Sequence, residues 1–77
     1  MTESEFMKRI GNNIRDELDY LEMTQRELSK ITGINQSILS RYIKGEVMPS
    51  LKNIINITCA LDCRIGEIIP MPNDLIK

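Results

Sequence analysis

Two short predicted helices on either side of a glycine constrain this chain more than any other feature of its sequence. Thr24 and Glu27 have the spacing of a reciprocal capping box, which predicts that a helix begins after Thr24. Gly33 ends that helix after about eight residues, and Asn35 is suited to cap a second helix that ends at Gly45. Helices of this length are not stable alone in water, so the pair has to pack against the rest of the chain.

Capping residues and apolar periodicity predict three more helices around this pair. The first begins near Thr2 and runs from about residue 4 to about residue 21. Another begins after Ser50, and a short last one spans Ile65 to Ile69 before Pro70. The residues expected to face the core are Phe6, Ile10, Ile14, Leu18 and Leu21 in the first helix, and Leu51, Ile54, Ile55, Thr58 and Leu61 in the fourth. The expected fold class is therefore all-α, a compact bundle of about four or five short helices.

The helix after Asn35 has two faces of opposite character. At about 100° per residue, its apolar residues fall on one side and its polar residues on the other. The apolar side consists of Ile38, Leu39, Tyr42 and Ile43, and the polar side of Gln36, Ser37, Ser40, Arg41 and Lys44. Leu28, Ile31 and Ile34 are expected to complete the apolar contact between this helix pair and the core. One side of the helix therefore packs, and the other presents amide, hydroxyl and cationic groups outward.

Charge is unevenly distributed along the chain. The net charge is −1, but residues 24–52 contain five basic and two acidic residues and so carry +3. That segment suits a polyanionic partner, whereas the overall charge does not. With two tyrosines, one phenylalanine and no tryptophan, the chain offers little stacking surface for single strands or RNA.

The residue inventory argues against catalysis and against bound cofactors or metals. The chain has no histidine, no glycine-rich phosphate loop and no nucleophile at a recognisable spacing from a base, so an enzyme is not expected. Cys59 and Cys63 could share one helical face, but zinc needs two further ligands, so we expect a reduced pair that behaves as small hydrophobes. No apolar stretch reaches the ~20 residues of a membrane span, and the polar N-terminus does not resemble a secretory signal. A soluble, cytoplasmic protein with no evident small-molecule ligand is expected.

Several residues at fixed spacing give the chain a family resemblance. They lie in the run MTQRELSKITGINQSILSRYIKGEVMPS and in LKNIINITCALDCRIGEII, which follows it. The most specific features are Thr24-Gln25, Glu27-Leu28-Ser29, Gly33, Gly45 and Pro49-Ser50. From residue 10 to residue 69 the sequence resembles the lambda-repressor-like domain of phage Cro and repressor proteins, the XRE family. The resemblance implies a helix-turn-helix around Gly33, in a regulator of transcription that acts as a repressor on double-stranded DNA.

The resemblance also implies which side chains contact DNA. The helix over residues 36–44 would enter the major groove, which is about 12 Å wide, and read bases with Gln36, Ser37 and Arg41. Gln bonds to adenine, and Arg to guanine, through paired hydrogen bonds, so these residue types suit that role. The expected contacts to the DNA backbone come from Gln25, Asn35, Ser40, Lys44 and Lys52.

The loop over residues 46–48 leaves a second function open. It lacks the basic residues that relatives often place against DNA, and Glu46 would repel phosphate. The alternative is a protein-interaction module of the same fold, such as an antitoxin-like or anti-repressor partner with weak or no DNA affinity.

The C-terminal end is rich in apolar residues for so small a core. Ile68, Ile69, Met71, Leu75 and Ile76 are candidates for the contact of a homodimer, whose two half-sites would lie about 34 Å apart. The same residues could instead close over the domain's own core. We expect residues 1–70 to form the DNA-binding domain and residues 71–77 to form a tail.

Overall fold

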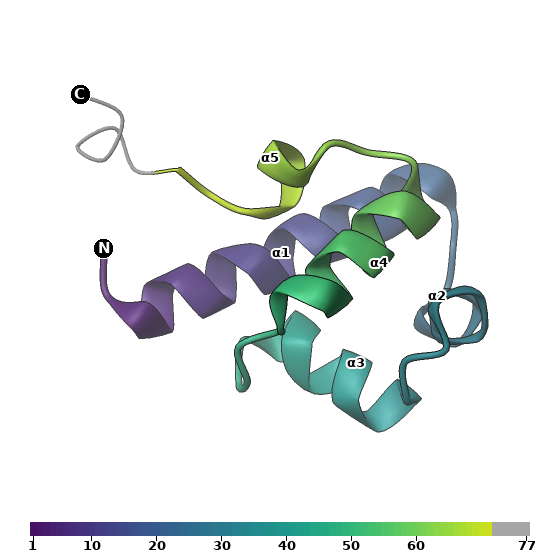
Figure 1. The fold of residues 1–77 in the computed structure, drawn as a ribbon, viewed down its shortest axis with the longest axis horizontal. Helices are drawn as coiled ribbons and strands as arrows, with labels where there is room; N and C mark the ends of the chain where they lie inside the picture. Colours follow the sequence, from purple (N-terminus) through teal and green to yellow (C-terminus); the bar gives the residue numbers. More distant parts are fainter. Residues whose placement is uncertain (72–77) are drawn as a thin grey trace.

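The computed structural model describes residues 1–71, which form five α-helices joined by short connections. The helices are α1 (Glu3–Leu21), α2 (Gln25–Thr32), α3 (Gln36–Lys44), α4 (Leu51–Leu61) and α5 (Ile65–Ile68), as Figure 1 shows. Residues 1–71 contain no strand, so the all-α fold class is confirmed. Within the same range, no helix combines the length and the apolar character that crossing a membrane requires.

The first four helices begin after the capping residues that the sequence identifies. Thr2, Thr24, Asn35 and Ser50 each accept a hydrogen bond from a backbone N–H in the first turn of the following helix. At Thr24 the box is reciprocal: Glu27 Oε1 accepts from the Thr24 N–H at 3.0 Å, and Thr24 Oγ1 accepts from the Glu27 N–H at 3.1 Å. These bonds satisfy N–H groups that have no partner within the helix, and they fix where each helix begins.

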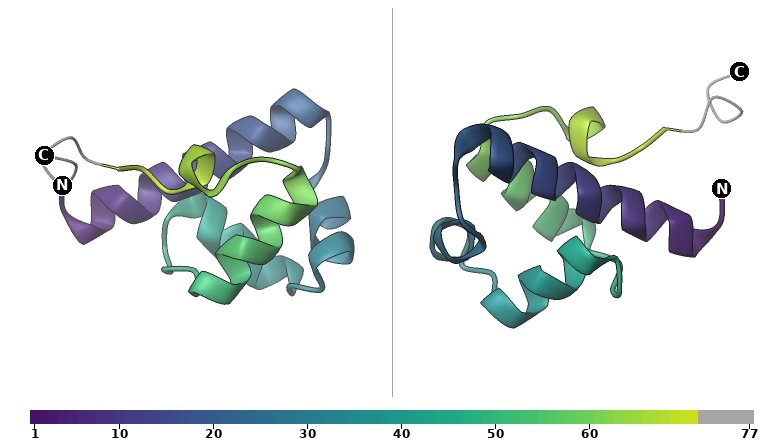
Figure 2. Two further views of the ribbon diagram at one scale, coloured as in Figure 1. Left: turned by 45° about the horizontal axis from the view of Figure 1, so that its top comes forward. Right: turned by 180° about the vertical axis from the view of Figure 1, so that it is seen from behind.

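The five helices form a bundle in which α1 is the longest member. α1 makes its most extensive contacts with α3, and α4 packs against α2. α5 packs against α4 and α1. It lies on the far side of the bundle from α3 (Figures 1 and 2). One face of α3 is therefore free of any other helix.

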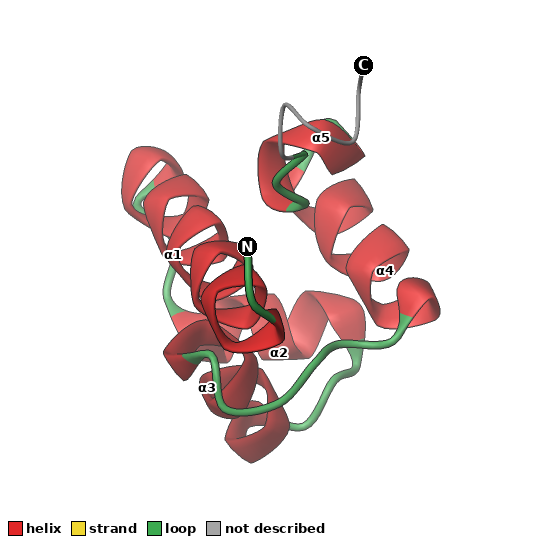
Figure 3. Cartoon of the chain, turned by 90° about the vertical axis from the view of Figure 1, so that its left-hand side faces the viewer, coloured by secondary structure: helices red, strands yellow, loops and turns green. Residues whose placement is uncertain are grey.

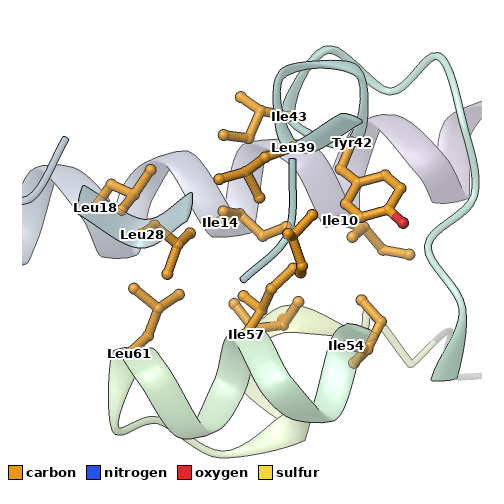
Figure 4. Close-up of a cluster of buried hydrophobic side chains, with 12 residues drawn as sticks. Ile10, Ile14, Leu18, Leu28, Leu39, Tyr42, Ile43, Ile54, Ile57 and Leu61 are labelled. Carbon is orange, nitrogen blue, oxygen red and sulfur yellow. The ribbon is translucent and has the colours of Figure 1, made fainter. Parts of the chain in front are cut away.

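A single cluster of apolar side chains fills the centre of the bundle (Figure 4). Its members are Ile10, Ile14, Leu18, Leu28, Ile34, Leu39, Tyr42, Ile43, Ile54, Ile57, Leu61 and Ile68. Phe6, Met23, Ala60, Cys63 and Ile69 pack against this cluster from its rim. Most of the predicted core is thus confirmed, including the buried side of α3.

Five residues that the sequence assigns to the core are exposed instead, namely Leu21, Ile31, Ile38, Leu51 and Ile55. Ile57, which the predicted stripe of α4 omits, is fully buried, because it lies about 160° from Ile55 on a helical wheel, on the side of α4 that faces the core. On α3, Ile38 lies at the edge of the apolar side, about 60° from Arg41 on a helical wheel, and is 44% exposed. Ile31 is 58% exposed. A stripe predicted from spacing therefore runs wider than the face that the neighbouring helices cover.

Three asparagine side chains tie one helix to another. Asn13 Nδ2 donates to the carbonyl oxygen of Ile68 (2.8 Å), Asn53 Nδ2 donates to Tyr42 Oη (2.8 Å), and Asn56 Nδ2 donates to the carbonyl oxygen of Thr32 (2.7 Å). All three bonds are partly buried, where an amide without a partner would destabilise the fold. They join α1 to α5, α4 to α3 and α4 to α2.

The contact between α1 and α3 depends on a glycine. Gly11 is buried, and a Cβ added there would lie 2.7 Å from the carbonyl oxygen of Tyr42 and closer still to that of Ile43. Any side chain larger than hydrogen would therefore separate the two helices. Gly11 sets the depth at which α3 sits on α1.

Candidate nucleic-acid interface

The turn between α2 and α3 is held by hydrogen bonds from side chains at the end of α2. Gly33 adopts a left-handed conformation (φ 75°, ψ 5°), as the sequence predicts. Ser29 Oγ donates to the carbonyl oxygen of Ile34, while Thr32 Oγ1 donates to that of Leu28 at 2.8 Å and accepts from the Ile34 N–H at 3.2 Å. Ser29 thus bonds α2 to the turn that follows. The angle between the two helices is fixed as a result.

α3 is held with its polar side outward. Leu39, Tyr42 and Ile43 are buried in the core, and Asn35 Oδ1 accepts from the Ser37 N–H at 2.8 Å at the start of the helix. Gln36, Ser37, Arg41 and Lys44 are exposed and Ser40 is half-buried. Figure 3 shows α3 on the side of the bundle away from α5, with α2 behind it. The predicted outward orientation of this face is confirmed.

A shallow polar groove runs along this exposed side. It has a volume of about 480 Å³. Its lining residues are Gln25, Gln36, Ser37, Ser40, Arg41, Lys44 and Glu46. Except for Gln25, at the first position of α2, they come from α3 and the loop after it. Amide, hydroxyl, guanidinium and ammonium groups therefore meet on one face.

The structure brings together six of the eight side chains that sequence analysis proposes for DNA contact. These are Gln36, Ser37 and Arg41, proposed for bases, and Gln25, Ser40 and Lys44, proposed for the backbone. Asn35 and Lys52 do not line the groove. The side-chain oxygen of Asn35 is engaged in capping α3, and Lys52 is exposed in the first turn of α4.

Glu46 is the residue of the groove that sequence analysis does not place there. The sequence suggests a loop carboxylate that repels phosphate, whereas in the structure the side chain lines the same groove as Arg41 and Lys44. The signal that could have placed it is Gly45, whose left-handed turn (φ 74°) directs the following residue back along α3. The groove thus contains two cations and one carboxylate.

A second cluster joins residues that are far apart in the sequence. One ligand atom each from Glu17 on α1, Cys63 after α4 and Glu67 on α5 lie within 4.8 Å of one another. Burial, followed by the negative charges of Glu17, Glu67 and Asp62, raises the pKa of the Cys63 thiol from 9.0 to about 11. The cysteine is therefore a neutral thiol at physiological pH. Spacing alone could not reveal this cluster, because Glu17 belongs to a different helix.

An apolar groove lies at the C-terminal end, on the opposite side of the bundle. It is lined by Leu51, Ile65, Gly66, Ile69 and Met71 and has a volume of about 380 Å³. Ile68, which the sequence offers for a dimer contact, is instead fully buried in the core of its own chain. Leu75 and Ile76, offered for the same contact, lie outside the described residues. Of the described candidates, Ile69 and Met71 reach this surface.

Most of the chain matches a single protein family. The family HTH_3, described as helix-turn-helix, matches residues 14–68. This range includes α2, the turn, α3 and α4. A segment of the Replication factor C small subunit of Methanocaldococcus jannaschii is 35% identical over 65 residues, or 84% of this chain. The chain spans 4% of the length of that relative, so the match concerns one small part of a much larger protein.

Solved structures share the arrangement of the helices. The restriction-modification controller protein C.AhdI from Aeromonas hydrophila superposes with a TM-score of 0.78 at 24% identity, covering 82% of this chain and 96% of its own. An HTH_3 family transcriptional regulator from Vibrio cholerae gives 0.82 at 18% identity, covering 87% of this chain and 38% of its own. A hypothetical transcription factor, NHTF from Neisseria, gives 0.81 at 18% identity, covering 99% and 87%. At these identities the likeness establishes the fold.

Proposed function

The chain belongs to the HTH_3 family of helix-turn-helix proteins, and from this premise we propose that it is a sequence-specific DNA-binding regulator of transcription. Family membership agrees with the resemblance to lambda-repressor-like domains. The role is one of binding without catalysis. In this proposal residues 1–70 form the DNA-binding domain and residues 71–77 form a tail.

The observation that supports DNA binding best is the polar groove on α3. A rigid helix that is packed on one side and free on the other fits a major groove about 12 Å wide. Arg41 and Lys44 project from that free side and are both exposed. No neighbouring helix has to move before α3 can approach a duplex, since α5 lies on the other side of the bundle.

The side chains of the groove divide into two roles. Gln36, Ser37 and Arg41 are proposed to bond to base edges, because their amide, hydroxyl and guanidinium groups match the donors and acceptors there. Gln25, Ser40 and Lys44 are proposed to bond to the DNA backbone. Gln25 is at the first position of α2, where the positive end of the helix favours phosphate. Asn35 and Lys52, which do not line the groove, are proposed as further contacts to the DNA backbone.

A homodimer is part of the proposal. One α3 helix reads only a few base pairs, whereas two copies on a two-fold site double the contacts. The apolar groove around Ile65 and Ile69 offers a surface for a second copy. Replacing exposed Ile65 with Glu should then yield a monomer by light scattering. Ile31→Glu, which changes an exposed residue on α2, serves as the matched control and should leave the oligomeric state unchanged.

The cytoplasm is the proposed location, because a DNA-binding regulator acts where the DNA lies. Repression is the proposed mode of regulation. Occupying a promoter is by itself sufficient to exclude another protein from it. An activator, in contrast, also needs a surface that contacts the transcription machinery.

Selection of duplexes from a random pool tests the function. The protein should enrich one sequence motif, and its affinity for that motif should fall steeply as salt rises, because phosphate contacts release counterions. The alternative is a protein-interaction module of the same fold, which Glu46 and the negative net charge of the chain favour. Such a module would enrich no motif. Failure to enrich a motif at low salt, with folded protein, would therefore refute DNA recognition.

A further inference from the structure

The backbone fixes the position of Glu46 from two sides. The Glu46 N–H donates to the carbonyl oxygen of Arg41 at 3.0 Å, directly after the left-handed turn at Gly45. Gly45 is itself buried against α1, where an added Cβ would lie 2.8 Å from the Cα atom of Lys8. The loop therefore cannot move away from the end of α3 without breaking the hydrogen bond or the contact with α1.

The surroundings of Glu46 make its charge exceptional within the groove. Of the seven lining residues, Arg41 and Lys44 are cationic, four are uncharged, and Glu46 is the one acid. An ionised carboxylate can only accept hydrogen bonds. Phosphate oxygens, guanine O6 and N7, and thymine O4 are also acceptors, so a carboxylate beside them is repelled.

Cytosine is the base whose major-groove edge suits a carboxylate. On the cytosine itself the N4 amine is a donor with no acceptor beside it, whereas on adenine the N6 amine lies next to the acceptor N7. A carboxylate that approaches adenine therefore gains one hydrogen bond but also meets a lone pair. The side chain of Glu46 is exposed and lines the same groove as Arg41, so a base edge that enters the groove is accessible to both.

We propose that Glu46 is a specificity-determining residue that accepts a hydrogen bond from the N4 amine of a cytosine in the half-site that α3 reads. This inference rests on the proposed DNA-binding function. The same carboxylate lowers the affinity for every duplex that lacks the cytosine, because phosphates and base acceptors then face an unpaired negative charge. Glu46 thus raises selectivity while it lowers overall affinity.

Selection from a random duplex pool, followed by titration of single-base variants of the enriched site, tests the proposal. Wild-type protein should enrich a cytosine at one position and prefer it about tenfold over the other bases there. Glu46→Ala should reduce that preference to about twofold or less and bind a random-sequence duplex about 2- to 5-fold more tightly. Glu46→Gln should shift the preference at the same position toward adenine, since an amide bonds to both N6 and N7.

Asp16→Asn is the matched control, because it removes one negative charge from an exposed position on α1. It should retain both the cytosine preference and the weak binding of random duplexes. An unchanged cytosine preference in Glu46→Ala overturns this inference and leaves DNA binding intact. If Asp16→Asn gained as much affinity as Glu46→Ala, and neither variant changed the base preference, the gain in affinity would come from net charge alone and the inference would be overturned. Failure of the wild-type protein to enrich any motif refutes the proposed function instead.

Discussion

Asn53 Nδ2 donates to the hydroxyl oxygen of Tyr42 at 2.8 Å, and this bond links the first turn of α4 to the last turn of α3. Tyr42 is buried, with its ring in the core and its hydroxyl at the end nearest α4. A polar group in such a position is stable only when it has a partner.

Breaking this bond from either side should destabilise the protein. Tyr42→Phe and Asn53→Ala should each lower the free energy of unfolding by about 0.5–1.5 kcal/mol. Because both remove the same bond, the double variant should lose less than the sum of the two. Urea denaturation of the four proteins measures the coupling, and additive losses would show that the two groups act independently.

Gly11 should tolerate no larger residue. Gly11→Ala places a Cβ 2.7 Å from the Tyr42 carbonyl oxygen, so α1 and α3 must separate, with an expected loss of about 1–3 kcal/mol in unfolding free energy. Gly66→Ala is the matched control: nothing lies within 4 Å of its Cβ, and the substitution should be neutral or stabilise by up to about 1 kcal/mol. Equal effects of the two substitutions in thermal denaturation would contradict the close contact.

Arg41 and Lys44 should differ in what they contribute to DNA binding. Arg41→Ala should weaken binding to the enriched site by about 1–3 kcal/mol and relax the preference at one base pair. Lys44→Ala should weaken binding to all duplexes similarly and reduce the salt slope by about 1. Titrations at several salt concentrations distinguish the two. If Arg41→Ala left the selected site unaffected, its assignment to a base would be wrong.

The reciprocal cap of α2 should respond to acid. The backbone N–H of Thr24, and then its hydroxyl, hold the pKa of Glu27 below its ordinary value of 4.5. A carboxyl group whose pKa is lower in the folded state contributes stability that is complete above the unfolded pKa and disappears as the pH falls through the folded pKa. Stability should therefore decline below about pH 4.5, and the decline should be shallower in Glu27→Gln. Denaturation curves of both proteins over the pH range from about 2 to about 6 provide the measurement. If the stability of wild-type protein and of Glu27→Gln declined in parallel, the cap would not contribute to the acid response.

Cys63 should react slowly with alkylating reagents at neutral pH. Its pKa of about 11 lies two units above the ordinary 9.0, so it provides about 100-fold less thiolate than an unperturbed thiol. In a Cys59→Ser background, the alkylation rate should keep rising up to about pH 11 rather than level off near 9. Glu17→Gln removes one of the raising charges and should accelerate the reaction at neutral pH. A rate that levels off near pH 9 would contradict the influence of burial and the neighbouring carboxylates.

Sequence reasoning succeeds here where a structure depends on residues a few positions apart. The cap at Thr24 and the turn at Gly33 require only local geometry, and both are found as predicted. The two sides of α3 can also be predicted from local sequence. Once the first residue of a helix is known, the helical repeat fixes the side on which each following residue lies.

Features that depend on tertiary placement are where sequence reasoning falls short. Ile55 and Ile57 are equally apolar, and only the position of the neighbouring helices makes the second one buried. The bond from Asn13 to the Ile68 carbonyl spans 55 positions, a separation at which amide side chains give no periodic signal. Glu46 could be recognised as an acidic loop residue, but its place in the groove follows from the packing of Gly45 on α1.

The bonds around the turn and at the start of α3 have a consequence for the kinetics of recognition. Ser29, Thr32 and Asn35 already hold the turn and the first turn of α3 in the unbound protein. Association with a duplex therefore requires no prior ordering of backbone, and the loss of entropy falls on a few exposed side chains. Such a preorganised helix is expected to associate at a rate governed by diffusion and electrostatic attraction, with no slower conformational phase.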